Sequence, residues 1–390
     1  MKKPRKNDLL TAGQTQEIAL SEDKVKFRTA LFIAAVLVAA VSFAYGVYGL
    51  FGSEPGLQEI TVQSGSGASC GDSFTFYYDL GRGEDSAASE KKSVRSLYSQ
   101  AAADAYQLFS ADREFDGCKN LWFINEHVNQ EIEVDPALYD ALVLLEKSGT
   151  RYHYLAPVYE LYFALFQCEN DQETLAYDPF LNGDMRGFFT EAALFINDPG
   201  EVNLELLGDG KIRLSVSDRY LRFAGENGIT RFIDLFWMKN AFIADHIAGI
   251  LLESGYTRGT LVSRDGFVRH LDDMEEFSFD PFHRDGVMVS SAGTVYLSGA
   301  ASLVYLHDYP LGNGDEGSYY VFKDGALRFP YADPADGLCK SAAAEIVAYS
   351  SELGCAELAL KLAPVYISDT LDESALQALA GEGVTVYLHS

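Results

Sequence analysis

The sequence predicts an α+β protein, a single domain with an antiparallel sheet and packed helices, preceded by one N-terminal transmembrane helix. Three observations lead to this prediction. Helix-like and strand-like patterns come in separate blocks, which favours α+β over a wound parallel sheet. The chain has 390 residues, 48% of them hydrophobic, which is enough for one large core. A run of 23 residues, 29–51, carries no charge.

The uncharged run TALFIAAVLVAAVSFAYGVYGLF is long enough to cross a membrane as a helix. It exceeds the apolar region of a cleaved signal peptide, which is usually about 7 to 15 residues. Basic residues cluster before it and the chain after it is acidic, so we expect a single-pass cell-membrane protein with a cytoplasmic N-terminus and an extracytoplasmic domain. The expected organisation is a basic tail (1–28), the membrane helix (29–51), a linker with the first strand (52–71), and the domain (72–390).

Charge and motif content exclude several functional classes. There are 30 Lys and Arg against 57 Asp and Glu, a net charge of -27, so we expect no nucleic-acid partner. The chain has no HExxH, GxSxG, Walker or Rossmann motif, and its five cysteines form no CxxC pair. The acidic clusters around 272–276 and 280–285 are interpreted as solvated loops rather than cation sites.

The domain is predicted to begin with two strands, 57–63 and 74–80, whose hydrophobic and polar residues alternate on either side of a Gly/Ser loop. Residues 81–93 are polar and predict a loop. Residues 94–109 place leucines and alanines at helical spacing and predict the first helix.

A second helix is expected to begin at Asp135 and Pro136, a capping side chain followed by a proline in the first helical position, and to end at Gly149. Alternating hydrophobic residues around Gly-Asp-Gly at 208–210 predict a hairpin and a later strand. A helix then follows from residue 236 and ends at Gly255. Further strands are predicted at 259–271, 293–299, 301–309, 318–329 and 384–390, and further helices at 342–353 and 372–380.

Six segments, taken in order, share features with one known family. They are 108–127, 133–161, 229–266, 295–302 with its Ser-Gly, 331–337 with its Asp-Pro and Gly, and 355–363 with its Ala-Glu. In these segments the chain resembles the FAD:protein FMN transferase (ApbE-like) family over residues 72–390.

The resemblance implies a T-fold-type domain outside the cytoplasmic membrane. Such a domain would bind FAD, cleave its pyrophosphate with Mg²⁺, release AMP, and attach FMN to a threonine of a partner flavoprotein, typically a membrane redox subunit. It implies catalytic roles for Asp333 and Glu357, with Glu357 also as the metal ligand. The cofactor-binding positions that it implies are Asp234, Asn240, Ser298, Gly299 and Gly337.

The positions that should serve FAD depart from the family pattern. Phe236 and Trp237 stand where the family has two glycines, and bulky side chains there would collide with a cofactor phosphate. Asn240 stands at the family's lysine position. Further departures are Ala300 for an aspartate, Pro330 for a histidine and Asp336 for a threonine.

The predicted metal position departs as well. Glu357 replaces an aspartate, and Lys361 replaces the threonine four residues later. This spacing predicts a salt bridge on one helix face, and the ammonium opposes Mg²⁺ by its charge.

The sequence therefore predicts a membrane-anchored ApbE-like protein in which Mg²⁺-dependent FMN transfer is lost or weakened, acting in flavoprotein or redox-complex assembly. Two alternatives stay open, namely an active transferase that uses FAD and Mg²⁺, and an unrelated surface-anchored binding protein.

Overall fold

The computed structural model describes residues 54–63, 69–286, 288–312, 315 and 317–388. The chain divides into two units at Glu54 and Pro55, and everything that follows concerns the second unit. Among the described residues, no helix has the length and apolar character needed to cross a membrane. The membrane helix predicted at 29–51 lies outside these residues.

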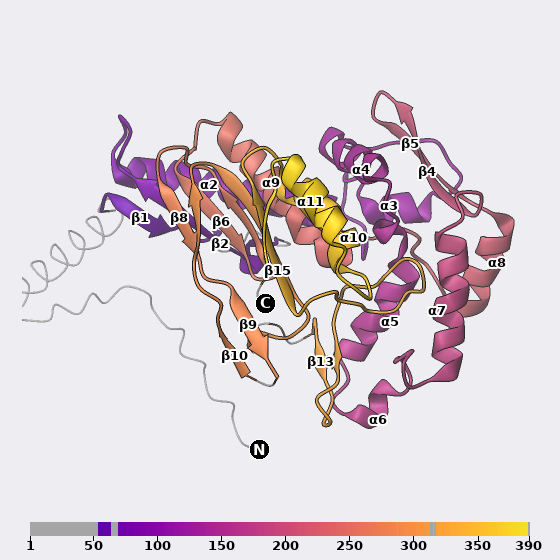
Figure 1. Cartoon of the computed structure of the whole chain (residues 1–390). Helices are drawn as coiled ribbons and strands as arrows, with labels where there is room; N and C mark the ends of the chain where they lie inside the picture. Colours follow the sequence, from indigo (N-terminus) through magenta and orange to yellow (C-terminus); the bar gives the residue numbers. More distant parts are fainter. Residues whose placement is uncertain (1–53, 64–68, 287, 313–314, 316, 389–390) are drawn as a thin grey trace, which may run out of the picture. The chain divides into compact units, whose positions relative to one another are not determined.

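A seven-stranded antiparallel sheet forms the centre of the unit, as the sequence predicts (Figure 1). Every neighbouring pair in it is antiparallel. In spatial order the strands are β1 (Gly56–Glu59), β2 (Phe74–Leu80), β6 (Gly259–Ser263), β7 (Phe267–His270), β12 (Ala301–His307), β15 (Glu345–Ser350) and β16 (Thr385–Tyr387).

Both faces of the central strand β12 are buried, and successive side chains point to opposite faces. Val304 and Leu306 belong to the main core, which three helices complete: α2 (Ala87–Leu108), α9 (Lys239–Glu253) and α10 (Cys355–Tyr366). Leu303 and Tyr305 belong to a smaller core. That core lies under a hairpin of β8 (Glu276–Phe279) and β11 (Val295–Ser298).

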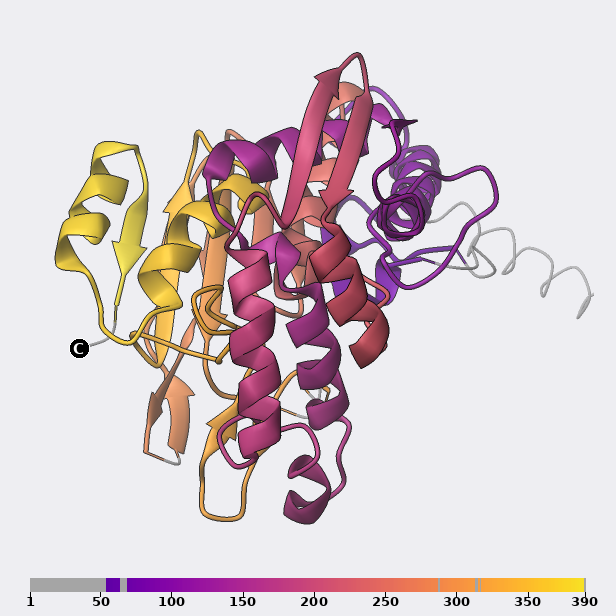
Figure 2. The ribbon, with the colours of Figure 1, turned by 90° about the vertical axis from the view of Figure 1, so that its right-hand side faces the viewer.

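Most of the other helices form a separate group beside the sheet, coloured from purple through magenta to red in Figures 1 and 2. At one end of this group stands a small sheet of β3 (Ile132–Glu133), β5 (Lys211–Val216) and β4 (Val202–Gly208). The helices are α3 (Leu121–Glu126), α4 (Pro136–Ser148), α5 (Ala156–Phe166), α6 (Asp171–Thr174), α7 (Gly183–Ile196) and α8 (Asp218–Asn227).

Short elements complete the unit. Two hairpins extend from it, one of β9 (Phe282–Asp285) and β10 (Met288–Ser291), the other of β13 (Tyr320–Val321) and β14 (Leu327–Arg328). Helix α11 (Glu373–Gly381) precedes the last strand. The 3-10 turns are η2 (Gly71–Ser73), η3 (Tyr152–Tyr154) and η4 (Phe236–Met238).

The predicted ends of α4 are confirmed. The Asp135 Oδ1 accepts a hydrogen bond from the Ala137 backbone N–H at 2.9 Å, and Pro136 occupies the first turn. Gly149 closes the helix with φ +67°, a conformation that favours glycine.

The strands predicted at 259–271 and 318–329 are each a hairpin of two strands. Three other predicted elements are wrong. Residues 342–353 contain strand β15 rather than a helix, because a short buried apolar run has no periodicity that distinguishes the two. The loop predicted at 81–93 contains the first turns of α2, which Ser86 caps by accepting from the Ser89 N–H. After the β4–β5 hairpin the chain forms α8, capped by Ser217, and not a further strand.

Candidate functional site

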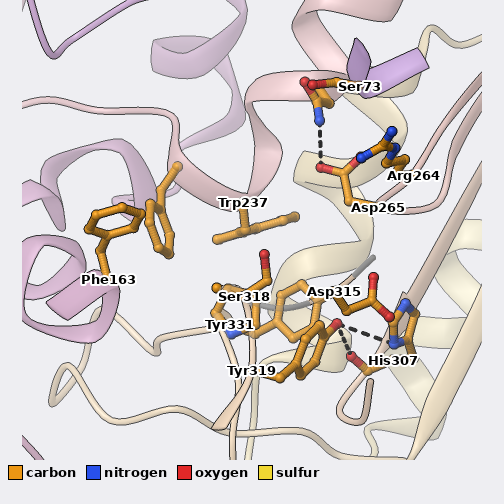
Figure 3. A pocket seen from close by; sticks show the side chains of 14 residues that line it. Ser73, Phe163, Trp237, Arg264, Asp265, His307, Asp315, Ser318, Tyr319 and Tyr331 are labelled. Carbon is orange, nitrogen blue, oxygen red and sulfur yellow. Dashed lines mark hydrogen bonds between the residues drawn. The ribbon is translucent and has the colours of Figure 1, made fainter. Parts of the chain in front are cut away.

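A cavity of about 350 Å³ opens where the loop before α9, the β6–β7 turn and the end of β12 meet (Figure 3). This volume is within the range of small-molecule pockets. The lining residues are Ser73, Phe163, Phe236, Trp237, Asn240, Arg264, Asp265, His307, Asp315, Gly317, Ser318, Tyr319, Pro330 and Tyr331.

The β6–β7 turn is fixed by a glycine. Gly266 has φ +93°, and a Cβ atom there would lie 2.1 Å from the carbonyl oxygen of Tyr305. The Gly266 carbonyl also accepts a hydrogen bond from the Tyr305 N–H at 2.8 Å. Because only glycine fits this close approach, the turn holds the preceding residue, Asp265, at the cavity wall.

Asp265 is an acidic group in a desolvated position. Its carboxylate accepts hydrogen bonds from the Ser263 hydroxyl at 2.6 Å and from the Asn240 side-chain amide at 2.9 Å. Burial raises the pKa of Asp265 to about 6. At pH 7 the group is therefore mostly ionised, and it titrates within the physiological range.

Aromatic rings form much of the remaining wall. The Trp237 ring meets Tyr331 edge to face, with centroids 5.4 Å apart. Tyr319 lies parallel to the His307 imidazole, with 5.5 Å between centroids. In the view of Figure 3, Trp237 lies between Asp265 above it and the two tyrosines below it. Such faces suit a flat ring system.

The imidazole of His307 is buried and carries no charge at neutral pH. Its Nδ1 donates to the Tyr309 carbonyl oxygen at 2.5 Å, and the Tyr319 hydroxyl donates to the His307 carbonyl at 3.0 Å. Burial lowers the pKa of His307. It therefore contributes a neutral polar wall rather than a cation.

Phe236 lines the cavity from an unusual backbone conformation. Its φ is +36°, and the described residues contain only two other non-glycine residues with positive φ. Its ring stacks on Tyr159, with centroids 4.5 Å apart and 16° between planes. The backbone at this position is thus of the kind that favours glycine, although it carries a large side chain.

Two residues of the predicted site lie in or beside the cavity. Asn240 lines it and holds Asp265. Asp234 is buried behind the loop, where it accepts from the Phe236 N–H at 3.2 Å and pairs with Arg231 at 3.4 Å. Burial raises the pKa of Asp234. Its place indicates that it shapes the loop rather than contacts a ligand.

Four other predicted residues do not line the cavity. Ser298 lies at the end of β11 opposite Glu276, and the Gly299 N–H donates to the Glu275 carbonyl at 3.4 Å. Asp333 and Gly337 close a tight turn through a 2.7 Å backbone hydrogen bond. That turn is held by Lys340, whose Nζ lies 2.8 Å from Asp333 and 2.9 Å from Asp336.

The residues present do not fit a Mg²⁺ site. The predicted ion pair between Glu357 and Lys361 is present at 3.9 Å, and Lys361 also pairs with Glu382 at 2.6 Å. Glu357 does not line the cavity. Within the part of the chain that the structure describes, no group of three or more His, Cys, Asp or Glu is arranged to hold a metal.

The N-terminus of α10 is capped by a side chain of the protein. The Asp245 carboxylate accepts from the Cys355 and Ala356 N–H groups, at 2.9 and 2.8 Å, at the start of α10. Helix N-termini bind anions through such N–H groups. Here a side chain of the protein is already their acceptor.

Comparison with solved structures places this architecture among known folds. The ApbE protein from Thermotoga maritima is similar with a TM-score of 0.56 and 13% identity, over 85% of this chain and 93% of that one. The chain has the fold of the ApbE flavin transferases. The flavin transferase ApbE from Vibrio cholerae matches with a TM-score of 0.51 and 12% identity, over 80% of this chain and 88% of that one. No family model matches the sequence, and no curated protein does.

The ApbE fold agrees with the resemblance found in the sequence, but several cavity residues were not foreseen. Asp265, His307, Tyr319 and Tyr331 come from separate segments of the chain. The Asp-Gly pair at 265–266 was a usable signal, because Asp-Gly marks tight hairpin turns. No local pattern marks the other three.

Proposed function

We propose that this chain is a membrane-anchored, extracytoplasmic protein of the ApbE fold that binds a flat ring ligand and does not carry out Mg²⁺-dependent FMN transfer. In this proposal it serves as a binding partner in the assembly of a flavoprotein or redox complex. The observation that carries the proposal is the composition of the cavity. Its described residues offer ring faces and carboxylates but no group of side chains arranged to hold a metal.

Loss of metal chemistry is supported by the pairing of Glu357. Its nearest cation, Lys361, is held on the same helix face and is itself fixed by Glu382. A divalent cation placed there would have to displace an ammonium group and would find one carboxylate instead of several oxygen ligands. No step that needs Mg²⁺ is therefore assigned to these residues.

The lining also disfavours the diphosphate of FAD. The described lining contains two carboxylates, those of Asp265 and Asp315, and one guanidinium, that of Arg264. Phosphate sites in proteins gather basic side chains or free backbone N–H groups. The start of α10, which could supply such N–H groups, is capped by Asp245.

Membrane attachment and the partner are supported by sequence and fold together. The uncharged run at 29–51 and the basic residues before it support a single-pass anchor with the domain outside the cytoplasm. One solved structure with this fold is described as a flavin transferase, which supports a partner of the flavoprotein class.

An activity measurement tests the proposal. The full-length protein is incubated with FAD, with and without Mg²⁺, and AMP is quantified. We expect no AMP above the buffer background in either condition. Mg²⁺-dependent AMP release that Glu357→Ala abolishes would overturn the proposal and establish an active transferase.

A further inference from the structure

We propose that the cavity selects a flat aromatic cation, because the Asp265 carboxylate faces a space walled by the rings of Trp237, Tyr319 and Tyr331. This inference rests on the proposed function, and it names the chemical class of the ligand. Asp265 is the residue that sets the preference for positive charge.

The first step is the unpaired charge of Asp265. Its two hydrogen bonds, from Ser263 and Asn240, come from neutral donors. Burial and the negative charge of Asp315 both act against its ionised form. Among the described residues Asp265 forms no ion pair. A partly buried anion without a cation is costly, and a cationic ligand would reduce that cost.

The second step is the balance of charge around the cavity. Among the described residues that line the cavity, Arg264 is the one basic side chain, and it is exposed. The buried His307 stays neutral, because burial lowers its pKa. Two carboxylates against one exposed guanidinium leave the lining anionic, which attracts cations and repels phosphates.

The third step is the shape and character of the walls. Trp237 and Tyr331 meet edge to face at 5.4 Å, and Tyr319 adds a further ring. Aromatic faces attract cations, tryptophan most strongly, and they stack on flat rings. A flat cation bound in the cavity can stack on the rings and pair with the Asp265 carboxylate at the same time.

Three probes with the same three-ring width test the proposal. Proflavine is a cation, riboflavin is neutral and FMN is an anion at pH 7.5. Each is titrated by calorimetry into the full-length protein. We expect proflavine to bind most tightly and FMN most weakly, with roughly a tenfold or larger difference between these two.

Two variants test whether the preference for a cationic ligand arises from Asp265. Asp265→Asn should weaken proflavine binding by roughly tenfold and should change riboflavin binding much less. Asp285→Asn makes the same charge change on an exposed residue of β9, outside the cavity, and should leave all three affinities unchanged. Equal loss with both variants would overturn the role of Asp265.

A measurement on the unmodified protein covers the case in which Asp265→Asn fails to fold. Added salt should weaken proflavine binding and leave riboflavin binding unchanged, since salt screens only the charged contact. FMN as the tightest ligand, or no binding of any probe, would overturn the inference. FMN as the tightest ligand would overturn the inference alone, whereas no binding of any probe would also overturn the flat ring ligand of the proposed function.

Discussion

Phe236 and Tyr159 stack with ring centroids 4.5 Å apart, and Phe236 does so from a backbone at φ +36°. A left-handed backbone costs a non-glycine residue about 1–2 kcal/mol. Stacking of two aromatic rings stabilises the folded state by about 0.5–1.5 kcal/mol. The protein therefore keeps a backbone that suits glycine while a ring closes this side of the cavity.

Two substitutions at one position test this relationship. Phe236→Gly and Phe236→Ala both remove the ring, but only glycine adopts φ +36° without strain. We expect the glycine variant to be more stable than the alanine variant by about 1 kcal/mol. Urea unfolding monitored by circular dichroism measures the difference. An alanine variant at least as stable as the glycine variant would show that the backbone here is not strained.

The β6–β7 turn gives a stronger prediction. Gly266→Ala places a Cβ atom 2.1 Å from the Tyr305 carbonyl oxygen, at φ +93°. We expect a loss of about 2 to 5 kcal/mol in the free energy of unfolding, measured with urea. Gly249→Ala is the matched control, because a Cβ atom at this position in α9 meets nothing within 4 Å. It should be neutral or stabilising by up to about 1 kcal/mol.

The raised pKa of Asp265 predicts a pH-dependent stability. An acid whose folded pKa is about 6 opposes folding when it ionises, so its cost is fully present above pH 6 and disappears as the pH falls through the unfolded value. Asp265→Asn removes this cost. Its stability relative to the unmodified protein should therefore rise between pH 5 and pH 8, by about 1 kcal/mol or more.

Urea unfolding at the two pH values measures this change, with Asp285→Asn as the control for charge. The negative charge of Asp315 acts in the same direction as burial and also raises the pKa of Asp265. Burial lowers the pKa of His307, so its imidazole adds no positive charge at the upper end of this range. A stability difference that falls as the pH rises would contradict the assignment.

The two carboxylates near the start of α10 should behave differently. Glu357 is half exposed and pairs with Lys361 at 3.9 Å, so Glu357→Ala should cost less than about 0.5 kcal/mol. Asp245 caps two backbone N–H groups, so Asp245→Ala should cost about 1–2 kcal/mol. Thermal and urea unfolding compare them. A large cost at Glu357 would mean that it does more than join a helix-face ion pair.

Local signals predicted the parts of the fold that depend on local interactions. Helix α4 was located by its cap at Asp135, by Pro136 and by Gly149. The alternation of hydrophobic and polar residues located β2, the β4–β5 hairpin and β12. The error at 342–353 arose around the short apolar run at 346–349, which is too short to show a helical or a strand period. Burial on both sides of the sheet decides the strand there, and this is tertiary information.

The candidate site was less predictable, because its residues come from elements far apart in the sequence. The family resemblance predicted Asn240 as a cofactor-binding position, and the structure places it in the cavity lining. Its contact with Asp265, 25 residues later, was not predicted. The spacing of Glu357 and Lys361 correctly predicted their ion pair. It could not show that this helix face lies outside the cavity lining, since that depends on how α10 packs.

The central claim is that Mg²⁺ plays no part in this protein's ligand binding. Calorimetric titration of the full-length protein with FAD, with and without Mg²⁺, tests it most directly. We predict that FAD binds weakly or not at all, and that Mg²⁺ leaves the result unchanged. FAD binding that tightens when Mg²⁺ is added would contradict the account.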